Sequence, residues 1–185
     1  QGINKIVLSV GYRYEVIRNY FGKSFSDAEL IYSIEDEPLG TGGAVKKSMN
    51  FIVNKDILVC NGDTFFKIDL HEFNKFHINK KSKLSVALKI IKQPDRYGVV
   101  EINKEQCIKS FLEKKQKKES LVNGGIYLIN KNFFTSFDLP QKFSLERDFL
   151  KKYYLNYKFY GFISDAYFID IGIPEDYEKA KNEIG

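Results

Sequence analysis

The chain has 185 residues, of which 43% are hydrophobic and 29% are charged, and its net charge is +5. These values are ordinary for a soluble globular protein and predict one domain over residues 1–185, long enough to bury a substantial core. No apolar run approaches the ~18 residues that a membrane-spanning helix needs, and we expect no charged-then-apolar leader, so the cytoplasm is the expected location.

The positive charge is concentrated in lysine-rich runs at residues 79–83 and 114–118. Such runs are usually solvated loops, and a phosphate-rich small substrate is an alternative use for them. No recognised nucleic-acid-binding motif accompanies the charge, so we expect neither a nucleic-acid partner nor a membrane partner. Cys60 and Cys107 lie in strand-like runs, which predicts buried core thiols. His77 is expected as a surface or rim residue, on or near the inner side of its helix.

Taken in chain order, the hydrophobic pattern alternates strands with helices. It opens with a buried strand over residues 6–10, a helix over 14–21 that ends at Gly22, and a second strand over 29–34. The later predictions are a helix over 44–51, a strand over 57–60, a helix over 70–78, strands over 84–90, 97–102, 107–112 and 121–129, short helices over 132–137 and 143–150, strands over 157–162 and 167–172, and a closing helix from about residue 174. Because the second half is denser in strands, we expect a mixed sheet.

The strand over residues 57–60 runs directly into Asn61, Gly62 and Asp63. A short apolar run bounded by turn residues is typical of an interior parallel strand, and ligands of open α/β sheets bind beyond the carboxyl ends of such strands. Asp63 is therefore expected where a substrate or metal would sit, and Gly62 lets the backbone come close to it. The alternative is a plain strand exit in which Asp63 caps a turn.

A glycine-rich segment, Pro38-Leu39-Gly40-Thr41-Gly42-Gly43-Ala44, follows the second strand. Its proline and three glycines predict a loop that enters the helix over 44–51. Such a loop permits a flat or phosphorylated ligand to approach backbone N–H groups, and the alternative is a turn with a glycine-rich cap. Gly124 and Gly125 interrupt the strand over 121–129, which indicates a bulge or a place where a ligand meets the backbone.

Five stretches together resemble the sugar-1-phosphate nucleotidyltransferases, also called nucleotide-sugar pyrophosphorylases. They are residues 38–44, Asn61-Gly62-Asp63, Tyr97-Gly98-Val99-Val100, Asn123-Gly124-Gly125-Ile126-Tyr127, and Phe168-Ile169-Asp170-Ile171-Gly172 running into Pro174-Glu175-Asp176-Tyr177. Their order and spacing span nearly the whole chain. The likeness is strongest to the bacterial branch that activates D-glycero-D-manno-heptose 1-phosphate with GTP, and mannose-1-phosphate guanylyltransferases are near relatives of that branch.

The resemblance implies an α/β fold of the nucleotide-diphospho-sugar transferase type, with a Rossmann-like, mixed, mainly parallel sheet flanked by helices. It also implies a Mg²⁺-dependent enzyme that converts GTP and a sugar 1-phosphate to an NDP-sugar and pyrophosphate, for capsule, lipopolysaccharide or other surface-polysaccharide synthesis. The base and the sugar stay open, with mannose 1-phosphate and dTDP- or CDP-linked products as alternatives. The many aromatic side chains permit a homodimer surface.

The resemblance further implies roles for individual residues. Asp63 and Asp170 would hold Mg²⁺, and Lys114 would supply a point charge to the sugar phosphate. The implied nucleotide-binding residues are Pro38, Leu39, Gly40, Thr41, Gly42, Asn61 and Gly62. The implied substrate-binding residues are Tyr97, Gly98, Glu113, Asn123, Gly124 and Glu146. The alternatives are that Asp170 is a cap before the last helix and that Lys114 is one member of a basic loop.

One signature of the family has no match in this sequence. Family members begin with a strand and a Gly-rich loop that carries an arginine and then a lysine, which together grip the triphosphate. The strand over residues 6–10 resembles their second strand instead. We expect that a first βα unit is missing from a longer chain, and the alternative is a non-catalytic homologue that binds a sugar phosphate.

Overall fold

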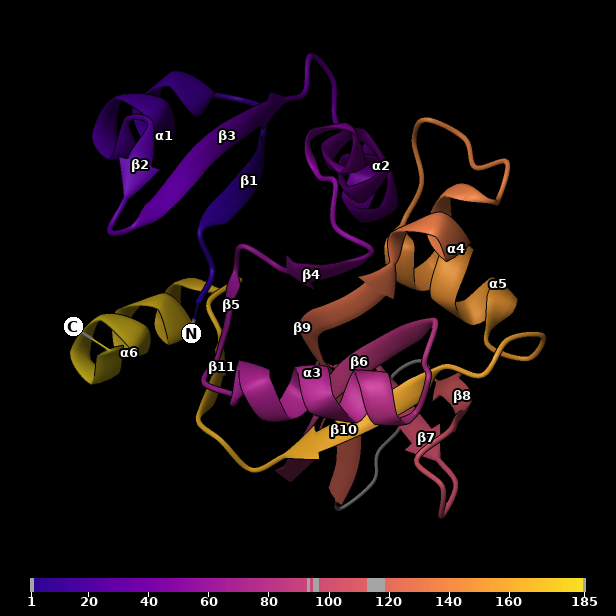
Figure 1. The fold of residues 1–185 in the computed structure, drawn as a ribbon. Coiled ribbons are helices and arrows are strands. Elements are labelled where there is room, and N and C mark those ends of the chain that lie inside the picture. The colour runs from indigo at the N-terminus through magenta and orange to yellow at the C-terminus, as the bar shows by residue number, and fades with distance from the viewer. Residues whose placement is uncertain (1, 93, 95–96, 113–118, 185) are drawn as a thin grey trace. The chain divides into compact units, whose positions relative to one another are not determined.

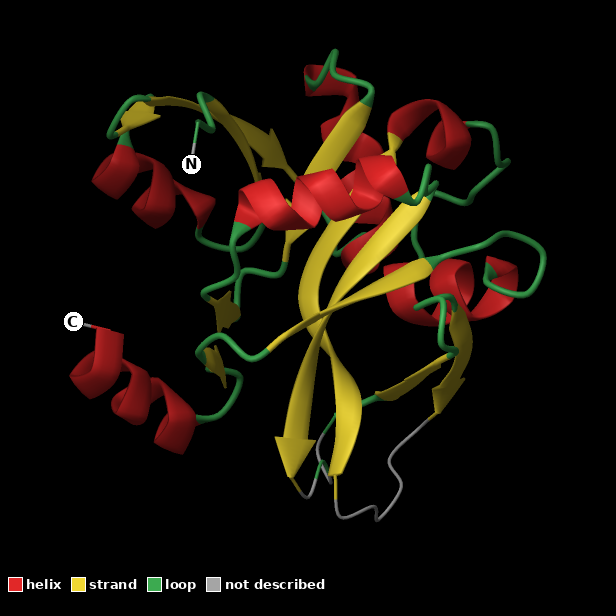
Figure 2. Ribbon diagram, turned by 60° about the horizontal axis from the view of Figure 1, so that its bottom comes forward, coloured by secondary structure: helices red, strands yellow, loops and turns green. Residues whose placement is uncertain are grey.

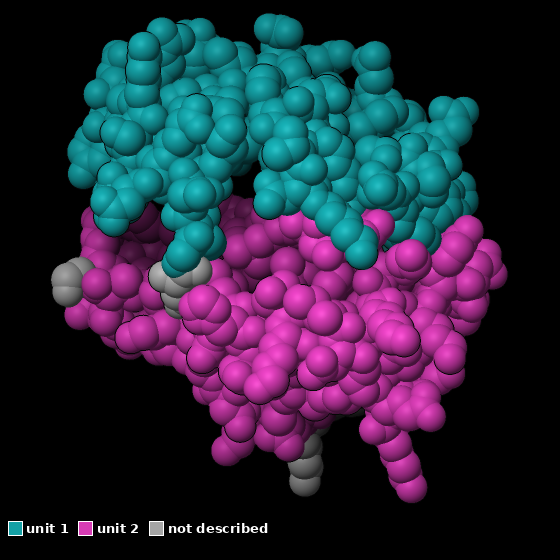
Figure 3. Space-filling view, in the orientation of Figure 1, with its two compact units in different colours: residues 1–55, 131–153 teal, residues 56–130, 154–185 magenta. Residues whose placement is uncertain are grey.

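The computed structural model describes residues 2–92, 94, 97–112 and 119–184. These residues form two compact units, each built from two stretches of the chain (Figure 3). Unit 1 comprises residues 1–55 and 131–153, and unit 2 comprises residues 56–130 and 154–185. In the part of the chain that is described, no helix is both long enough and apolar enough to cross a membrane. That the whole chain acts as one domain stays a prediction.

Unit 1 contains a small sheet and a group of short helices (Figure 1). In the sheet, β1 and β3 are parallel over their whole length, from Lys5↔Glu29 to Val10↔Ile34, and β2 adds to the far side of β3. The predicted strands at both ends of α1 and the glycine that ends this helix, Gly22 at φ 66°, are confirmed. The elements are β1 (Lys5–Val10), α1 (Tyr14–Phe21), β2 (Ser24–Phe25), β3 (Ala28–Ile34), α2 (Gly40–Ser48), η1 (Met49–Phe51), α4 (Lys131–Thr135), η2 (Leu145–Leu150) and α5 (Lys151–Tyr153).

Unit 2 contains a larger, mostly antiparallel sheet whose strand order is β10-β6-β9-β7-β8, with β4 also paired to β9. The long strands β6 and β9 lie side by side. In both views α3 lies across one face of this sheet (Figures 1 and 2). A separate two-stranded ladder joins β5 to β11. The elements are β4 (Asp56–Cys60), β5 (Thr64–Phe66), α3 (Leu70–Asn79), β6 (Leu84–Lys92), β7 (Val99–Ile102), β8 (Ile108–Leu112), β9 (Glu119–Asn130), β10 (Tyr160–Ser164), β11 (Phe168–Asp170) and α6 (Pro174–Ile184).

Each unit has its own apolar core. In unit 1 the core is aromatic, with the Phe134 ring 4.7 Å from Phe149 and stacked over Phe143. In unit 2 the α3 side chain of Phe73 is fully buried against the sheet. The buried cluster of unit 2 consists of Phe66, Ile68, Phe73, Ala87, Ile126 and Leu128. Burial of such side chains from water supplies the main stabilisation of both units.

The mixed α/β class is confirmed, but the described ladders are less parallel than expected. Among the strands of the described residues, only β1 with β3 and β6 with β10 pair in parallel. In particular, β4 is antiparallel to β9, with Ile57 opposite Ile129, so the prediction of a parallel strand over 57–60 is wrong. An apolar run reports that a strand is covered on both faces, and it carries no information about the direction of the neighbouring strand.

Two side chains are buried differently from the sequence prediction. His77 was expected at the surface or rim of its helix but is 2% exposed, and its Nδ1 lies 2.8 Å from the Ser85 hydroxyl. Cys60, the last residue of β4, was expected in the core but is exposed, whereas Cys107 is buried as predicted. A periodic pattern distinguishes buried from exposed side chains least well at two kinds of position. These are single polar residues on an amphipathic helix and the last residue of a strand.

Candidate active site

The Asn61-Gly62-Asp63 tip is fixed in unit 2 against the glycine pair of β9. The Asn61 N–H donates to the Gly125 carbonyl at 2.8 Å, which extends the ladder between β4 and β9 by one residue. Gly125 has a φ of +71°, and a Cβ there would lie 3.1 Å from the side-chain Nδ2 of Asn61. Glycine is therefore needed at 125 both for its backbone conformation and for this close approach.

Asn123 fixes the shape of the same bend. Its Oδ1 accepts from the Gly125 N–H at 3.0 Å, and its Nδ2 donates to the Tyr127 hydroxyl at 2.8 Å. The pairing of β9 with β6 shifts register at this point, so the predicted bulge is confirmed. A Cβ on Gly124 would lie 2.4 Å from the Phe66 ring, which shows that this glycine lets β9 pack on β5. Contacts of Asn123 and Gly124 with a sugar phosphate stay predictions.

The two candidate metal ligands lie on neighbouring strands of unit 2. Asp170 on β11 is directly opposite Thr64 on β5, and the Ile171 N–H donates to the Asp63 carbonyl at 2.8 Å. Side chains directly opposite each other in an antiparallel ladder point to the same face, with Cβ atoms about 4.5–5.5 Å apart. Thr64 Oγ1 donates to Asp63 Oδ1 at 3.4 Å, so the Asp63 carboxylate lies beside the side chain that faces Asp170.

Carboxylate oxygens are the ligand type that a hard divalent cation prefers. Asp63 is exposed and Asp170 is partly exposed, and the Gly172 N–H donates to Asp170 Oδ1 at 2.9 Å, which orients that carboxylate. Among the described residues, no group of three or more His, Cys, Asp or Glu side chains could hold a metal. Mg²⁺ commonly binds through one or two carboxylates and completes its shell with water and substrate phosphates, so two aspartates suffice for it.

Tyr97 lies beside the same ladder. Its ring is 5.8 Å from the Phe168 ring on β11, and Phe168 is 5.3 Å from Phe66 on β5. Gly98 is exposed, and the nearest atom to a Cβ at this position would be the Leu112 carbonyl oxygen at 4.0 Å. Packing against the described residues therefore does not require a glycine at 98.

In unit 1 the glycine-rich segment is helical from Gly40 onward, which corrects the predicted loop over residues 40–44. The helix α2 begins at Gly40, where φ is +72°, and includes Gly42 and Gly43. Both glycine N–H groups donate to the Phe143 carbonyl, at 3.0 and 3.3 Å. A Cβ at Gly42 would lie 2.2 Å from the Phe143 ring. These glycines allow close packing of α2 on the segment before η2, and their N–H groups are already bonded to the chain itself.

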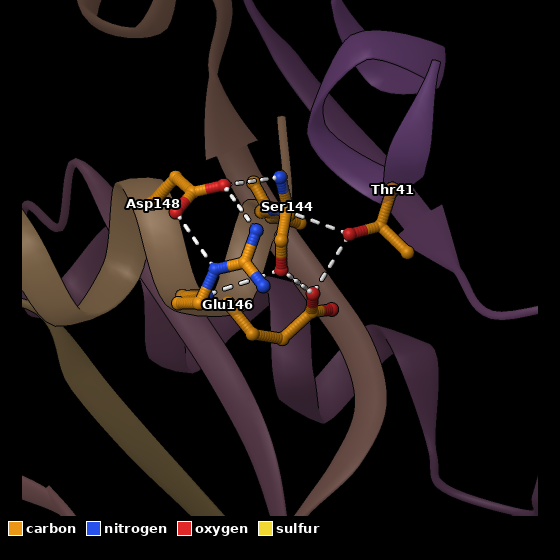
Figure 4. A network of polar contacts seen from close by, with 6 residues as sticks. Thr41, Ser144, Glu146 and Asp148 are labelled. Atoms are coloured by element: carbon orange, nitrogen blue, oxygen red, sulfur yellow. Dashed lines mark hydrogen bonds and ion pairs between the residues drawn. The ribbon is translucent and has the colours of Figure 1, made fainter. Parts of the chain in front are cut away.

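Glu146, at the start of η2, meets Thr41 in this packed region (Figure 4). Thr41 Oγ1 donates to Glu146 Oε2 at 2.7 Å, and the Ser144 hydroxyl reaches the same oxygen at 3.0 Å. Ser144 is the predicted N-cap, and its Oγ accepts from the Arg147 N–H at 3.1 Å. The Arg147 guanidinium and the Ser144 N–H bond the Asp148 carboxylate and lower its pKa from 3.8 to about 2.

A hollow of about 460 Å³ opens in unit 1 beyond the carboxyl ends of the parallel strands β1 and β3. It is lined by residues 11–15, which follow β1, by Ile34 at the end of β3, and by residues 35–38 after that strand. Its acidic members are Glu15, Glu35, Asp36 and Glu37. The sequence analysis missed this lining, although Gly11 directly after a buried strand was an available signal, because such ends of parallel strands are common ligand sites.

A family model described as Nucleotidyl transferase matches residues 1–185. The chain belongs to the nucleotidyl transferase family. Its sequence is 48% identical to a D-glycero-α-D-manno-heptose 1-phosphate guanylyltransferase of Aneurinibacillus thermoaerophilus over 184 residues, which are all of this chain and 80% of that protein. It is 49% identical to the enzyme of the same name from Campylobacter jejuni, over 96% of this chain and 77% of that protein.

The solved structures of nucleotidyl transferases include a similar protein with a bound nucleotide. HddC from Yersinia pseudotuberculosis, crystallised in complex with GMP-PN, has a TM-score of 0.89 and 34% identity, and the match covers 100% of this chain and 80% of HddC. The predicted family and fold class are therefore confirmed. Nucleotidyl transferases generally use divalent metal ions, which agrees with the paired carboxylates of unit 2.

The predicted site residues of this nucleotidyl transferase lie in both units. Unit 2 brings together Asn61, Gly62, Asp63, Tyr97, Asn123 and Asp170, and unit 1 brings together Gly40, Thr41, Gly42 and Glu146. The sequence prediction gave Thr41 to the nucleotide and Glu146 to the sugar phosphate and did not foresee their contact. Glu113 and Lys114 lie outside the described residues.

Proposed function

We propose that this nucleotidyl transferase transfers GMP from GTP to a sugar 1-phosphate and that the sugar is D-glycero-D-manno-heptose. A phosphate oxygen of the sugar 1-phosphate attacks the α-phosphorus of GTP, the bond from that phosphorus to the β-phosphate oxygen breaks, and pyrophosphate leaves. The GDP-heptose would serve surface-polysaccharide synthesis. The observation that carries the proposal is the antiparallel pairing of β5 with β11, which brings Asp63 beside Asp170.

Phosphoryl-type transfer needs positioning and charge neutralisation from the protein more than covalent chemistry. We assign Asp63 and Asp170 to a bound Mg²⁺, which when present would neutralise phosphate charge. The preceding Gly62 is exposed, and no described atom lies within 4 Å of a Cβ built on it. Such open space beside the two carboxylates supports an approach of a phosphate to the backbone at this tip.

The acidic hollow of unit 1 supports a guanine nucleotide. Carboxylates accept hydrogen bonds but cannot donate them, so they favour a base edge rich in N–H donors and disfavour phosphates. Guanine offers an amino group, which adenine lacks at the corresponding edge. Glu35 is preoriented, because its Oε2 accepts from the Leu39 N–H at 3.0 Å. We therefore extend the predicted nucleotide-binding set of residues 38–42, Asn61 and Gly62 to Glu35.

The sugar phosphate is assigned to the remaining predicted residues. Glu146 would accept hydrogen bonds from sugar hydroxyls, and Asn123 would contribute its amide. The full proposed set is Tyr97, Gly98, Glu113, Asn123, Gly124 and Glu146, with Lys114 as a cation for the phosphate. The relatives named above support the heptose, because two of them carry that activity in their names at 48% and 49% identity. A cytoplasmic location and a homodimer stay predictions.

The test is release of pyrophosphate by the full-length protein that contains this chain, with Mg²⁺, GTP and D-glycero-α-D-manno-heptose 1-phosphate. Matched reactions replace the sugar with mannose 1-phosphate or glucose 1-phosphate, and GTP with ATP, CTP, UTP or dTTP. We expect GTP and the heptose to give the highest kcat/KM. Activity with another nucleotide and sugar phosphate would change the substrates that we assign. Release of no pyrophosphate with any pair would refute the enzymatic activity and favour a binding protein.

A further inference from the structure

Thr41 makes two hydrogen bonds to the start of η2, and both use its hydroxyl oxygen. The hydroxyl donates to Glu146 Oε2 at 2.7 Å and accepts from the Leu145 N–H at 2.8 Å. Figure 4 shows the Thr41 side chain, on α2, directed at the Glu146 carboxylate. These contacts join residues that are 104 and 105 positions apart in the sequence.

The surrounding packing holds Thr41 in this position. Gly42 and Gly43 donate to the Phe143 carbonyl, and a Cβ on Gly40 would lie 2.6 Å from that same oxygen. The first turn of α2 is therefore fixed on residue 143, one residue before the N-cap of η2. Because both partners are fixed through their backbones, the hydroxyl of residue 41 meets the carboxylate without a large rearrangement of either element.

Two hydroxyls then converge on one oxygen of Glu146. Ser144 reaches Oε2 at 3.0 Å in addition to Thr41 at 2.7 Å. A glutamate side chain has several rotatable bonds, and an exposed one samples many rotamers. Hydrogen bonds from fixed donors to an ionised acceptor are among the stronger kinds, so this pair selects one orientation of the carboxylate.

We propose that Thr41 is a positioning residue: its hydroxyl orients the Glu146 carboxylate for the hydroxyls of the sugar 1-phosphate. This inference rests on the proposed function, in which Glu146 binds the sugar. It assigns the side chain of a residue in the glycine-rich segment to the sugar side of the reaction. Substitution at 41 should then alter the use of the sugar phosphate more than the use of GTP.

A purely structural role for Thr41 makes a different forecast. If the hydroxyl serves only to satisfy the Leu145 N–H, its loss lowers the melting temperature and leaves both KM values unchanged. The two roles are separated by four variants of the full-length protein and one control. The variants are Thr41→Val, Thr41→Ser, Glu146→Ala and the double variant Thr41→Val/Glu146→Ala. The control is Thr135→Val, which removes a hydroxyl that bonds only backbone carbonyls of α4 among the described residues.

We expect Thr41→Val to raise the KM for the sugar 1-phosphate about 10-fold, as loss of one hydrogen bond to a charged group predicts. The KM for GTP should change by less than about twofold, and Thr41→Ser, which keeps the hydroxyl, should restore the sugar KM. In the Glu146→Ala background, Thr41→Val should have no further effect on it. Equal changes in both KM values, or additive effects in the double variant, would overturn the inference.

A crystal structure of Thr41→Val separates this inference from the proposed function. We expect the Glu146 carboxylate to leave the position that faces residue 41, while η2 stays helical. An unmoved carboxylate would overturn the positioning role whatever the protein catalyses. A carboxylate that moves in Thr41→Val, in a protein whose wild type releases no pyrophosphate, would show that Thr41 orients Glu146 and would refute both the guanylyl transfer and the sugar as the partner of that carboxylate.

Discussion

Two glycine-containing segments, one in each unit, lie in opposite environments. In unit 1, a Cβ on Gly43 would lie 2.2 Å from the Gln141 carbonyl oxygen, so packing within the chain requires the missing side chain. In unit 2, Gly62 has no described atom within 4 Å of such a Cβ. A glycine that its own chain does not require leaves space for something else. We therefore expect a ligand to contact the backbone at the tip in unit 2, whereas the unit 1 glycines are required for packing within unit 1.

The largest expected effect is on catalysis. It comes from substitution of Asp63, which follows Gly62, or of Asp170 on β11. Asp63→Asn and Asp170→Asn should each lower kcat/KM on the order of 100-fold or more, because each removes one ligand from the site that neutralises phosphate charge. Both variants should keep the wild-type melting temperature to within a few degrees, since Asp63 is exposed and Asp170 is partly exposed. Pyrophosphate release and thermal unfolding measure the two quantities. Wild-type turnover in either variant would remove that residue from the metal site.

The next effect is on stability, in the packed segment of unit 1. Gly43→Ala raises helix propensity by about 1 kcal/mol. It also places a methyl group against the Gln141 backbone, and such overpacking destabilises a fold by about 1–3 kcal/mol or more. We expect a net loss in the free energy of unfolding, measured by denaturant titration. An unchanged or higher free energy would show that the close approach of residues 43 and 141 is not a required contact.

A smaller and opposite pattern is expected for Gly62→Ala. Its φ is outside the left-handed region and its surroundings are open, so stability should stay the same or rise by about 0.4–1 kcal/mol. Activity should fall about 10-fold if the new methyl group meets a substrate phosphate. This variant is the matched counterpart of Gly43→Ala. Loss of stability without loss of activity would reverse the comparison between the two segments.

The smallest effect concerns the polar contacts that close the start of η2. The pKa of Asp148 is lowered from 3.8 to about 2 by Arg147 and the Ser144 N–H. A lowered pKa means that the ionised carboxylate stabilises the folded state above 3.8 and that this contribution is lost as the pH falls toward 2. Asp148→Asn should therefore melt below wild type near neutral pH, and the difference should shrink near pH 2. A difference that does not depend on pH would assign the effect to packing.

The sequence predicted most of the secondary structure. The periodicity over residues 14–21 matched α1 residue for residue, because a capping glycine at 22 and an apolar stripe are both local signals. The nearness of Asp63 and Asp170 came from the family resemblance, since nothing in either local sequence reports that β5 pairs with β11. The prediction that β4 is a parallel strand was wrong for the same reason, because distant residues decide how a strand pairs.

The glycine-rich segment shows where local reasoning fails. Pro38 and the glycines signal weak helix propensity, and the prediction of a loop followed from it. The structure forms α2 there because residues 141–143, about a hundred positions away, pack into the space that the glycines leave. The contact of Thr41 with Glu146 depends on that packing and could not be read from either motif alone. Tertiary packing overrides propensity when it removes a large apolar side chain such as Phe143 from water.

The central claim is that Asp63 and Asp170 bind one divalent cation together. Titration of Mn²⁺ into the full-length protein with a non-hydrolysable GTP analogue, followed by the electron paramagnetic resonance signal of free Mn²⁺, measures this directly. The account predicts one bound ion whose affinity falls about 10-fold or more in Asp63→Asn and in Asp170→Asn, and is unchanged in Asp148→Asn. Wild-type Mn²⁺ affinity in both single variants and in the double variant would contradict it.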